Sequence, residues 1–300
     1  MPNAEHEPVL VQAVLRELSP RPGMVVVDGT VGLGGHAAAI IPLISPGGTY
    51  VGLDVDAEML ASARERLKDW KDCRVELVHA SYAEFREVVR TIGSQRVDAV
   101  LLDLGANSAQ LDDPARGFSF TRDGPLDMRF DRSQKRTAAD LVNSLPETEL
   151  ADMIYELGQD HASRRIARKI CQVRHKARIT TTLALARAVE SSLAGISGGG
   201  GKIHPATRVF QALRIAVNLE LDNLERFLAV AAESLNVGGK LMIISFHSLE
   251  DAIVKKFLRS PAGASLSEST KRPIVADDDE RKRNPRSRSA KMRVCVKEHD

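Results

Sequence analysis

The feature that most constrains the fold is a β-branched run that leads into a glycine-rich turn. Residues 25–36 read Val-Val-Val-Asp-Gly-Thr-Val-Gly-Leu-Gly-Gly-His, and an alanine-rich stretch follows them. A strand, a glycine turn and a helix in this order are typical of the first unit of a nucleotide-binding α/β sheet. Asp54 ends the next apolar run, at a place where an acid suits a ribose. We therefore expect a small-molecule cofactor with an adenosine half.

Short apolar runs and amphipathic stretches alternate regularly before residue 104. They predict strands at 24–28, 49–54, 75–79 and 97–103, with helices at 34–41, 57–68 and 82–91. This alternation indicates a doubly wound, Rossmann-like α/β sheet that is mostly parallel. Ligands bind such sheets at the carboxyl ends of the strands, so we expect the functional side chains there.

Turn-forming residues interrupt this pattern after Asp103. Helical patterns run from about 137 to 194, and residues 195–201, with five glycines in seven positions, predict a flexible connection. We expect an inserted helical domain at 108–203 within a discontinuous α/β domain formed by 1–107 and 204–300.

The pattern after residue 204 returns to α/β. We expect a helix at 206–235 stopped by Gly238 and Gly239, a strand at 240–246, a helix from 249, irregular structure at 260–285 and a last strand at 290–297.

Composition excludes several classes of protein. The 300 residues are 43% hydrophobic, which suffices for a large core, yet no apolar stretch reaches 18 residues and the first seven residues do not resemble a signal peptide. We therefore expect a cytoplasmic protein without a membrane partner. Cys73, Cys171 and Cys295 lie far apart, and the eight histidines lack metal-ligand spacing, so we expect neither disulfides nor a bound metal.

Charge at the strand ends discriminates between cofactors. The glycine run also satisfies the loose dinucleotide pattern G-x-G-x-x-A, which leaves a nicotinamide dehydrogenase as an alternative. Asp28, Asp54 and Asp103, however, end three expected strands and would repel a pyrophosphate. S-adenosylmethionine carries a sulfonium and an ammonium, which carboxylates attract. We therefore expect S-adenosylmethionine, with its ribose on Asp54 and its carboxylate near the helix start at Gly35.

Two side chains near this edge allow more than one interpretation. Asp28 either contacts the cofactor or braces the glycine loop from a buried position. Tyr82 follows the third strand, where it either stacks on the adenine or packs into the core.

Two basic clusters indicate a phosphate-bearing partner. Residues 161–178 contain seven Lys or Arg and no acid, and a stripe of Ile166, Ile170 and Val173 would leave the cations exposed. The expected RNA-binding cations are Arg164, Arg165, Arg168 and Lys169 here, and Arg286 and Arg288 in the second cluster at 281–293. Acids at 277–280 would partly neutralise the second cluster, and a solvated face without a partner is the alternative for both. Together with the methyl donor, these clusters favour a nucleic-acid methyltransferase over an RNA-binding factor without activity.

Six motifs closely resemble those of the bacterial MraW family, the ribosomal RNA small subunit methyltransferases H. They are Asp28–His36, Leu102–Gly105 with Gln110–Asp112, Arg116–Phe120 through Gly124–Arg129, Phe210–Leu221, Ser245–Asp251 and Asn284–Ser289. The resemblance spans nearly the whole chain. It implies S-adenosylmethionine-dependent N4-methylation of a cytidine in the decoding region of 16S ribosomal RNA in the small subunit, with the helical insert helping to bind the cytidine.

The resemblance also implies particular cofactor contacts. These are Gly34, Gly35, His36, Asp54, Tyr82, Asp103 and Gln110. The chain departs from the family where Ala106–Ala109 replace the usual Val-Ser-Ser-Pro, where Tyr82 replaces the commoner phenylalanine, and where Gly158–Asp160 replace Gly-Glu-Glu. The tyrosine preserves a stacking face.

Methylation of an exocyclic amine requires a group that accepts the amine hydrogens. The chain lacks the Asn-Pro-Pro-Tyr loop of DNA amino-methyltransferases, and residues 103–108 occupy its topological place. Asp103, the Asn107 side chain or a backbone carbonyl of this loop is the expected acceptor.

Further expectations concern the substrate and a helix start. His247 follows a strand end and either contacts the RNA or plays a structural part beside Ser248, the expected N-cap with Asp251 in its capping box. Phe118, Phe120 or Phe130 either stacks on the flipped base or pins a loop to the core.

Overall fold

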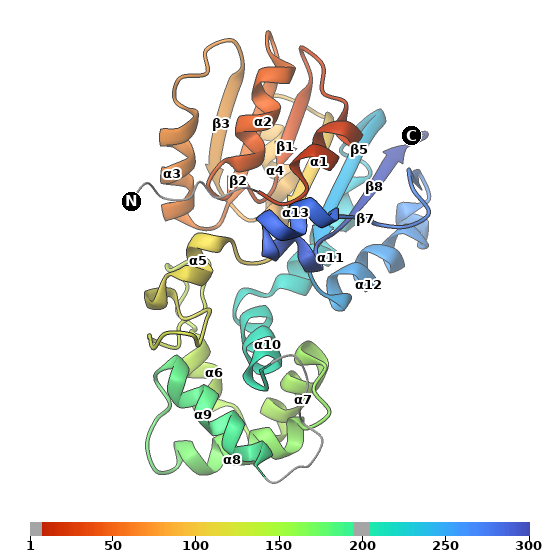
Figure 1. Ribbon diagram of the computed structural model, residues 1–300. Coiled ribbons are helices and arrows are strands. Elements are labelled where there is room, and N and C mark those ends of the chain that lie inside the picture. The colour runs from red at the N-terminus through yellow and green to blue at the C-terminus, as the bar shows by residue number, and fades with distance from the viewer. Residues whose placement is uncertain (1–7, 195–203) are drawn as a thin grey trace. The chain divides into compact units, whose positions relative to one another are not determined.

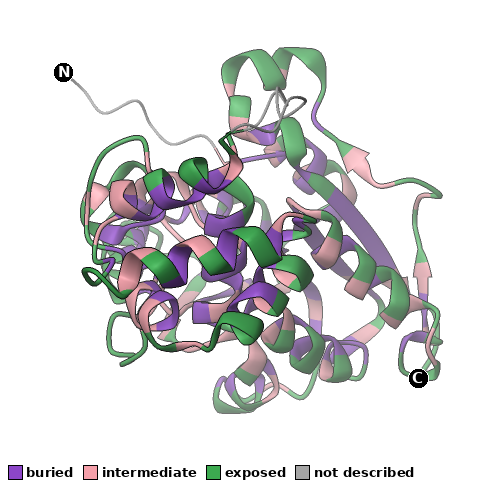
Figure 2. Ribbon diagram, turned by 90° about the horizontal axis from the view of Figure 1, so that it is seen from below, coloured by how far each residue is buried: buried purple, intermediate pink, exposed green. Residues whose placement is uncertain are grey.

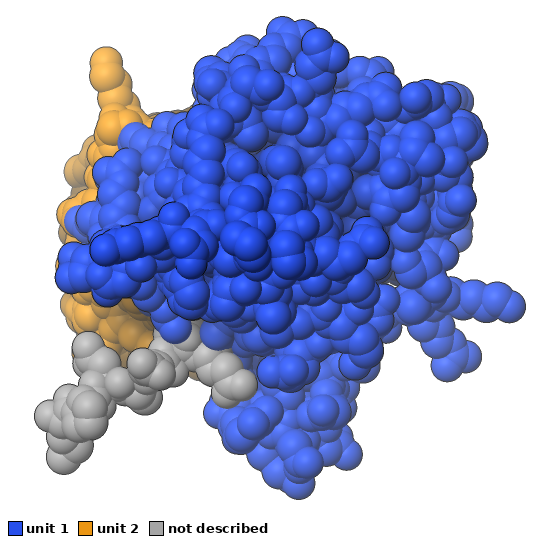
Figure 3. All heavy atoms as spheres, turned by 90° about the horizontal axis from the view of Figure 1, so that it is seen from above, with its two compact units in different colours: residues 1–105, 221–300 blue, residues 106–220 orange. Residues whose placement is uncertain are grey.

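The computed structural model describes residues 8–194 and 204–300, and the glycine-rich segment at 195–201 lies outside them. Contacts divide the chain into two compact units, residues 1–105 with 221–300 and residues 106–220 (Figure 3). The sequence placed the end of the insert at 203, whereas helix α10 (Ala206–Asn218) belongs to the second unit. The reason is packing: Val209, Phe210 and Leu213 of α10 lie in the apolar core of that unit.

The first unit contains a mostly parallel sheet, which confirms the expected α/β class (Figure 1). Parallel strands follow the order β3-β2-β1-β4-β5, and β8 runs antiparallel beside β5. The strands are β1 (Val25–Asp28), β2 (Thr49–Asp54), β3 (Arg74–His79), β4 (Val97–Asp103), β5 (Leu235–Ser245), β6 (Leu266–Glu268), β7 (Ile274–Val275) and β8 (Lys291–Lys297). Both β6 and β7 pair with β8.

Helices cover both faces of this sheet, so successive strand residues are buried on opposite sides. Val26 lies in a cluster with residues of α1, α2 and α3, and Val27 lies in a cluster with residues of α4, α11 and α12. Figure 2 shows buried strands, with helices that are buried along one side and exposed along the other. The helices are α1 (Val11–Leu18), α2 (Gly35–Ile44), α3 (Ala57–Leu67), α4 (Phe85–Thr91), α11 (Glu220–Ala231), α12 (Ser248–Leu258) and α13 (Asp278–Arg283).

Two expectations for the C-terminal part are wrong. The expected helix at 206–235 is broken at Leu219, whose φ of 51° is left-handed, so α10 ends there and α11 begins at Glu220. Gly238 and Gly239 do not stop a helix but lie within β5, where the register against β4 shifts between Val97 and Ala99. The segment 260–285, expected to be irregular, contains the short elements β6, β7 and α13. The last strand is confirmed as β8.

The second unit is helical around its own apolar core. Its helices are α5 (Ser108–Asp112), α6 (Ala138–Ser144), α7 (Glu147–Gly158), α8 (Ser163–Arg174), α9 (Thr182–Leu193) and α10. Ile166 and Ile170 of α8 are fully buried, as the apolar stripe predicted, and Val173 packs against the same core. Throughout residues 8–194 and 204–300, no helix combines the length and the apolar character that crossing a membrane requires.

Candidate active site

Three acids end neighbouring strands of the sheet. Asp28 is the last residue of β1, Asp54 of β2 and Asp103 of β4, and β1 pairs in parallel with both other strands. The carboxyl ends of parallel strands meet at one edge, so all three carboxylates belong to the same edge of the first unit. This is the edge at which the sequence placed the cofactor.

The glycine loop turns from β1 into α2 beside these acids. Gly34 caps α2 with a φ of 76°, a left-handed conformation that glycine adopts without strain. Gly35 is the first residue of α2 and packs against Pro8. A Cβ at this position would lie only 2.8 Å from Pro8 Cγ, so there is no room for a larger residue. The free N–H groups of this helix start favour an anionic group such as a carboxylate.

The side chain of Asp54 binds the main chain of the glycine loop. Its Oδ2 accepts a hydrogen bond from Gly32 N at 2.8 Å, and its Oδ1 accepts one from Asp56 N at 2.9 Å. Burial raises the pKa of Asp54 to about 6, against the lowering effect of these two bonds. A carboxylate oxygen has two acceptor positions, so each oxygen keeps one for a ribose hydroxyl.

Asp28 proves to be the brace of the loop, one of the two interpretations that its sequence position allowed. The side chain is 1% exposed, and its oxygens accept hydrogen bonds from Tyr50 Oη at 2.7 Å and from Thr30 N at 3.0 Å. The Thr30 hydroxyl in turn accepts a hydrogen bond from Asp103 N at 2.7 Å. Sequence reasoning missed Thr30 and Tyr50, although a phenol in the middle of an apolar strand signals a buried partner.

His36 and Asp103 leave buried polar atoms unsatisfied. His36 is 5% exposed, and neither ring nitrogen has a hydrogen-bond partner within the described residues, although Nε2 lies 3.6 Å from Asp103 Oδ2. Asp103 Oδ1 is also buried without a partner there. Buried polar atoms are nearly always hydrogen-bonded, so these atoms indicate a place for polar groups of a ligand.

Tyr82 packs against the core. It opens the 3₁₀ turn η1 (Tyr82–Glu84), and its ring meets the edge of Phe227 with centroids 6.0 Å apart. Core packing, one of the two interpretations, therefore accounts for one side of the ring. Stacking on an adenine stays a prediction.

Asn107 and Gln110 lie in the second unit, where they form the cap of α5. Asn107 Oδ1 accepts a hydrogen bond from Gln110 N at 3.0 Å, and Gln110 Oε1 accepts one from Asn107 N at 3.1 Å. The expected amine acceptor Asn107 thus already has a structural task. The spacing Asn-x-x-Gln is a capping-box signal that the sequence analysis overlooked.

The first basic cluster is less free than the sequence suggested. Arg164 pairs with Asp152 at 2.8 Å, Arg168 pairs with Glu147 at 3.6 Å, and Arg165 donates to the carbonyl of Ala194. Lys169 is half-buried. The segment itself has no acid, but the neighbouring α7 supplies two, and this packing was invisible in the local sequence.

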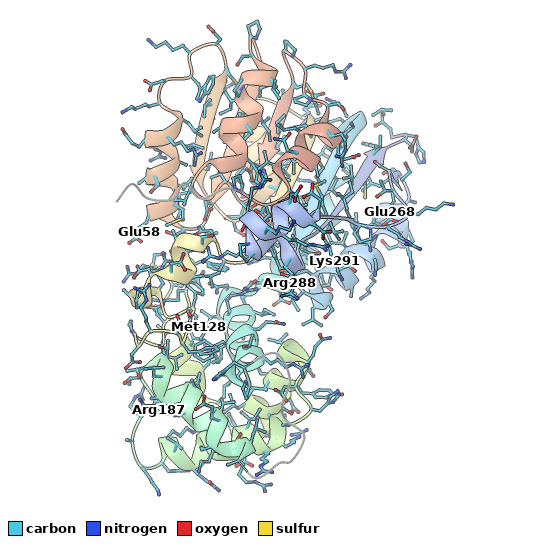
Figure 4. The ribbon with its side chains drawn as sticks, viewed as in Figure 1. Glu58, Met128, Arg187, Glu268, Arg288 and Lys291 are labelled. Carbon is cyan, nitrogen blue, oxygen red and sulfur yellow. The ribbon has the colours of Figure 1, made fainter. Side chains whose placement is uncertain are left out.

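The second basic cluster belongs to the first unit. Arg288 lies exposed in the 3₁₀ turn η4 (Pro285–Ser289), Arg286 is half-buried there, and β8 begins at Lys291 opposite Ser245, the last residue of β5 (Figure 4). The start of β8 therefore lies at the same edge as the acids. Pairs within α13, Arg281 with Asp278 and Lys282 with Asp279, neutralise part of the cluster as expected.

His247, not Ser248, caps α12. Its Nδ1 accepts from Glu250 N at 3.4 Å, while Glu250 Oε2 accepts from the backbone N of His247 at 3.2 Å. Asp251, expected in the capping box, instead binds Arg293 at 2.6 Å. A histidine cap was missed because Ser is the commoner N-cap residue. A substrate contact of His247 remains a prediction.

The phenylalanines of the turn-rich segment pin that segment to the second unit. Phe118 stacks on Phe130 with centroids 5.2 Å apart, and Phe120 meets the edge of Phe210 at 4.8 Å. Phe118 is 7% exposed. The packing interpretation therefore accounts for these rings.

Comparison with known proteins decides the family. A model described as the MraW methylase family matches residues 3–298. The chain belongs to the MraW methylase family. It is accordingly a methyltransferase that uses S-adenosylmethionine, and the acidic strand ends together with the unsatisfied atoms of His36 and Asp103 fit that cationic cofactor.

Curated relatives of this methylase cover nearly its full length. The Ribosomal RNA small subunit methyltransferase H of Syntrophobacter fumaroxidans is 46% identical over 313 residues, which cover 99% of this chain and 98% of the relative. The proteins of the same name from Sorangium cellulosum and Deinococcus radiodurans are 48% and 47% identical, covering 97% and 98% of this chain and 90% of each relative.

Proposed function

We propose that this methylase transfers a methyl group from S-adenosylmethionine to N4 of a cytidine in the decoding region of 16S ribosomal RNA. The observation that carries the proposal is the carboxylate edge of the sheet, where Asp103 Oδ1 and both ring nitrogens of His36 are buried and have no hydrogen-bond partner among residues 8–194 and 204–300. The name shared by the full-length relatives supports the RNA of the small ribosomal subunit as substrate. The proposed place of action is the cytoplasm, where small subunits assemble.

The cofactor is assigned to the edge formed by the glycine loop and the strand ends. Gly34, Gly35 and the following helix start receive its carboxylate, Asp54 accepts its ribose hydroxyls, and Asp103 attracts its ammonium. When bound, the cofactor supplies an electrophilic methyl group on a cationic sulfur. Tyr82 and Gln110 complete the proposed set of contacts.

The protein must align the cytosine amine and accept its proton. The amine is a poor nucleophile because its lone pair is delocalised into the ring, so alignment with the methyl group accounts for much of the catalysis. Asp103 is the preferred acceptor of an amine N–H, since its main chain is fixed by Thr30 and its Oδ1 has no partner among the described residues. Asn107 is a weaker candidate because its side-chain oxygen caps α5.

Cations on both units are proposed to bind the RNA backbone. They are Arg164, Arg165, Arg168 and Lys169 of α8 and Arg286 and Arg288 of η4, with His247 as a further contact. Because acids of α7 already pair with two of these arginines, RNA phosphates would have to exchange for carboxylates there. The helical unit, residues 106–220, is the proposed reader of the substrate.

The test is transfer of labelled methyl from S-adenosylmethionine to small ribosomal subunits that lack the modification. Nucleoside analysis of the RNA should place the label in N4-methylcytidine, and the Asp103→Asn variant should transfer far less. Label in another nucleoside would refute the assigned atom, and transfer to DNA in a parallel assay, with none to the subunits, would refute the substrate. Tight RNA binding without transfer, while the cofactor binds normally, would indicate an assembly factor.

A further inference from the structure

A buried chain of hydrogen bonds connects the interior of the sheet with the cofactor edge. Tyr50 Oη donates to Asp28 Oδ2 at 2.7 Å, and the backbone N of Thr30 donates to Asp28 Oδ1 at 3.0 Å. The Thr30 hydroxyl lies 3.4 Å from the same Oδ1 and accepts from Asp103 N at 2.7 Å. The chain therefore runs from Tyr50, the second residue of β2, through the end of β1 to the end of β4.

The hydrogen-bond donors around Asp28 favour its ionised form. A hydroxyl has a single proton, and Thr30 Oγ1 already accepts from Asp103 N, so its own proton points to Asp28. Asp28 then receives donors on both oxygens, one from Tyr50 and two from Thr30. An ionised carboxylate accepts all three of them without a hydrogen of its own that competes with a donor.

The Tyr50 hydroxyl lies in an apolar part of the core, where its bond to Asp28 is the interaction that accounts for it. Tyr50 is 0% exposed and belongs to an apolar cluster that also contains Ile40 and Leu60. Burial and the Asp28 charge raise the pKa of Tyr50 well above its ordinary value, so the phenol keeps its proton and donates. Burying a hydroxyl without a hydrogen bond is unfavourable, so we attribute the presence of the Tyr50 hydroxyl to its bond with Asp28.

We propose that Tyr50 is a positioning residue for cofactor binding, which keeps Asp28 ionised and thereby fixes Thr30, the glycine loop and the main chain of Asp103. Asp28 does not touch the cofactor in this view. It acts through Thr30, and its buried negative charge adds to the attraction that Asp54 and Asp103 exert on a cationic ligand. This role of Tyr50 concerns cofactor binding alone, so its test does not depend on the identity of the RNA substrate.

Several charged and polar groups around Asp28 determine its pKa. Burial raises the pKa of Asp28, and the charge of Asp103 at the end of β4 raises it further. His36 on α2, the Thr30 N–H and the Tyr50 hydroxyl on β2 lower it. Asp54 at the end of β2 also interacts with Asp28. Removing the Tyr50 donor therefore shifts Asp28 towards its protonated form, and the shift is reversed when the pH is raised.

The experiment compares the Kd of S-adenosylmethionine for the wild type and Tyr50→Phe by calorimetry between pH 6 and pH 9. We expect binding to Tyr50→Phe to be about tenfold weaker at the acid end, because Asp28 without the Tyr50 donor becomes protonated there and no longer fixes Thr30 and the loop. The ratio of the two Kd values should return towards one at the alkaline end, where Asp28 is ionised again. The ratio removes most of the titration of Asp54, which both proteins share. Tyr155→Phe makes the same chemical change on an exposed tyrosine of α7 and should bind as the wild type does.

Asp28→Asn provides the second arm, because asparagine cannot titrate. Its affinity should be reduced at every pH, and adding Tyr50→Phe to it should cause no further loss, since the two residues act in one chain. Thermal unfolding of each variant checks that it folds. An unchanged Kd in Tyr50→Phe, a loss of equal size at all pH values, or additive losses in the double variant would each overturn the proposal.

Discussion

At the scale of single residues, the three acids at the sheet edge differ in how many of their oxygens are already engaged. Asp28 and Asp54 each accept hydrogen bonds on both oxygens, and in each case one donor is a backbone N–H of the glycine loop, that of Thr30 or Gly32. Asp103 keeps Oδ1 buried and without a partner in the described part of the chain. The first two acids therefore shape the loop, and Asp103 is the carboxylate that is available to the reacting groups.

Asp103→Asn and Asn107→Ala should consequently fail in different ways. Asp103→Asn should lower kcat on small subunits by about 100-fold or more, the usual range for loss of a general base, and leave thermal stability nearly unchanged. Asn107→Ala should lose the α5 cap, which costs about 1 kcal/mol of stability, with only a small change in kcat. Single-turnover rates with saturating cofactor, alongside unfolding curves, separate the two effects. Full turnover of Asp103→Asn would remove it from the mechanism.

The raised pKa of Asp54 predicts a pH dependence of cofactor binding. With its pKa at about 6, Asp54 is ionised at neutral pH and becomes protonated as the pH falls through that value. Protonation removes acceptor capacity for the ribose and the attraction for a cation, so the Kd of S-adenosylmethionine should rise below pH 6. Asp54→Asn should bind more weakly at neutral pH, and its Kd should lose the portion of the acid dependence that belongs to this group. If the wild-type and Asp54→Asn profiles ran parallel from pH 5 to pH 8, another group would be responsible.

At the scale of helices and strands, sequence patterns predicted the elements that hold the cofactor better than the places where the chain turns. Apolar runs located β1, β2 and β4 because the buried strands of a parallel sheet are apolar along most of their length, and β3, a half-exposed strand at the end of the sheet, was found from its shorter apolar pattern. The sequence gives no sign of the break at Leu219, because a left-handed residue at the end of a helix is usually a glycine. The cap at His247 and the ion pairs of α8 with α7 also depend on which side chains tertiary packing brings together.

Leu219 offers a stability test of this break. A leucine with a φ of 51° carries a left-handed backbone that costs an L-residue about 1–2 kcal/mol. Leu219→Gly should therefore raise the free energy of unfolding by up to about 1 kcal/mol, after the greater entropy of glycine in the unfolded chain is subtracted. Leu43→Gly is the matched control, because Leu43 is also exposed but lies inside α2, where glycine should destabilise by about 1 kcal/mol. Denaturant titrations should show opposite signs, and equal destabilisation would mean that Leu219 is not strained.

At the scale of the whole molecule, electrostatics alone supplies only modest attraction for RNA. The formal net charge is +2, and ion pairs engage several of the cations that the sequence offered as free phosphate binders. A protein that neutralises few phosphates gains little from counterion release and has a shallow dependence on salt. Recognition of the proposed cytidine should then depend on the shape that surrounds it, and in the proposed substrate, the assembled small subunit, ribosomal proteins and folded RNA create that shape.

The assembled small subunit should accordingly be the better substrate. We expect kcat/KM for assembled small subunits to exceed that for a short protein-free transcript of the same decoding region by at least about tenfold, and the difference to persist when salt is raised from 50 to 200 mM. Shape recognition is insensitive to salt, whereas a preference produced by additional phosphate contacts would shrink as counterions compete. Methyl transfer to both substrates, measured in parallel at the two salt concentrations, distinguishes these explanations. Equal turnover on the transcript would mean that the enzyme reads the local sequence, and the helical unit would then have to supply base contacts of its own.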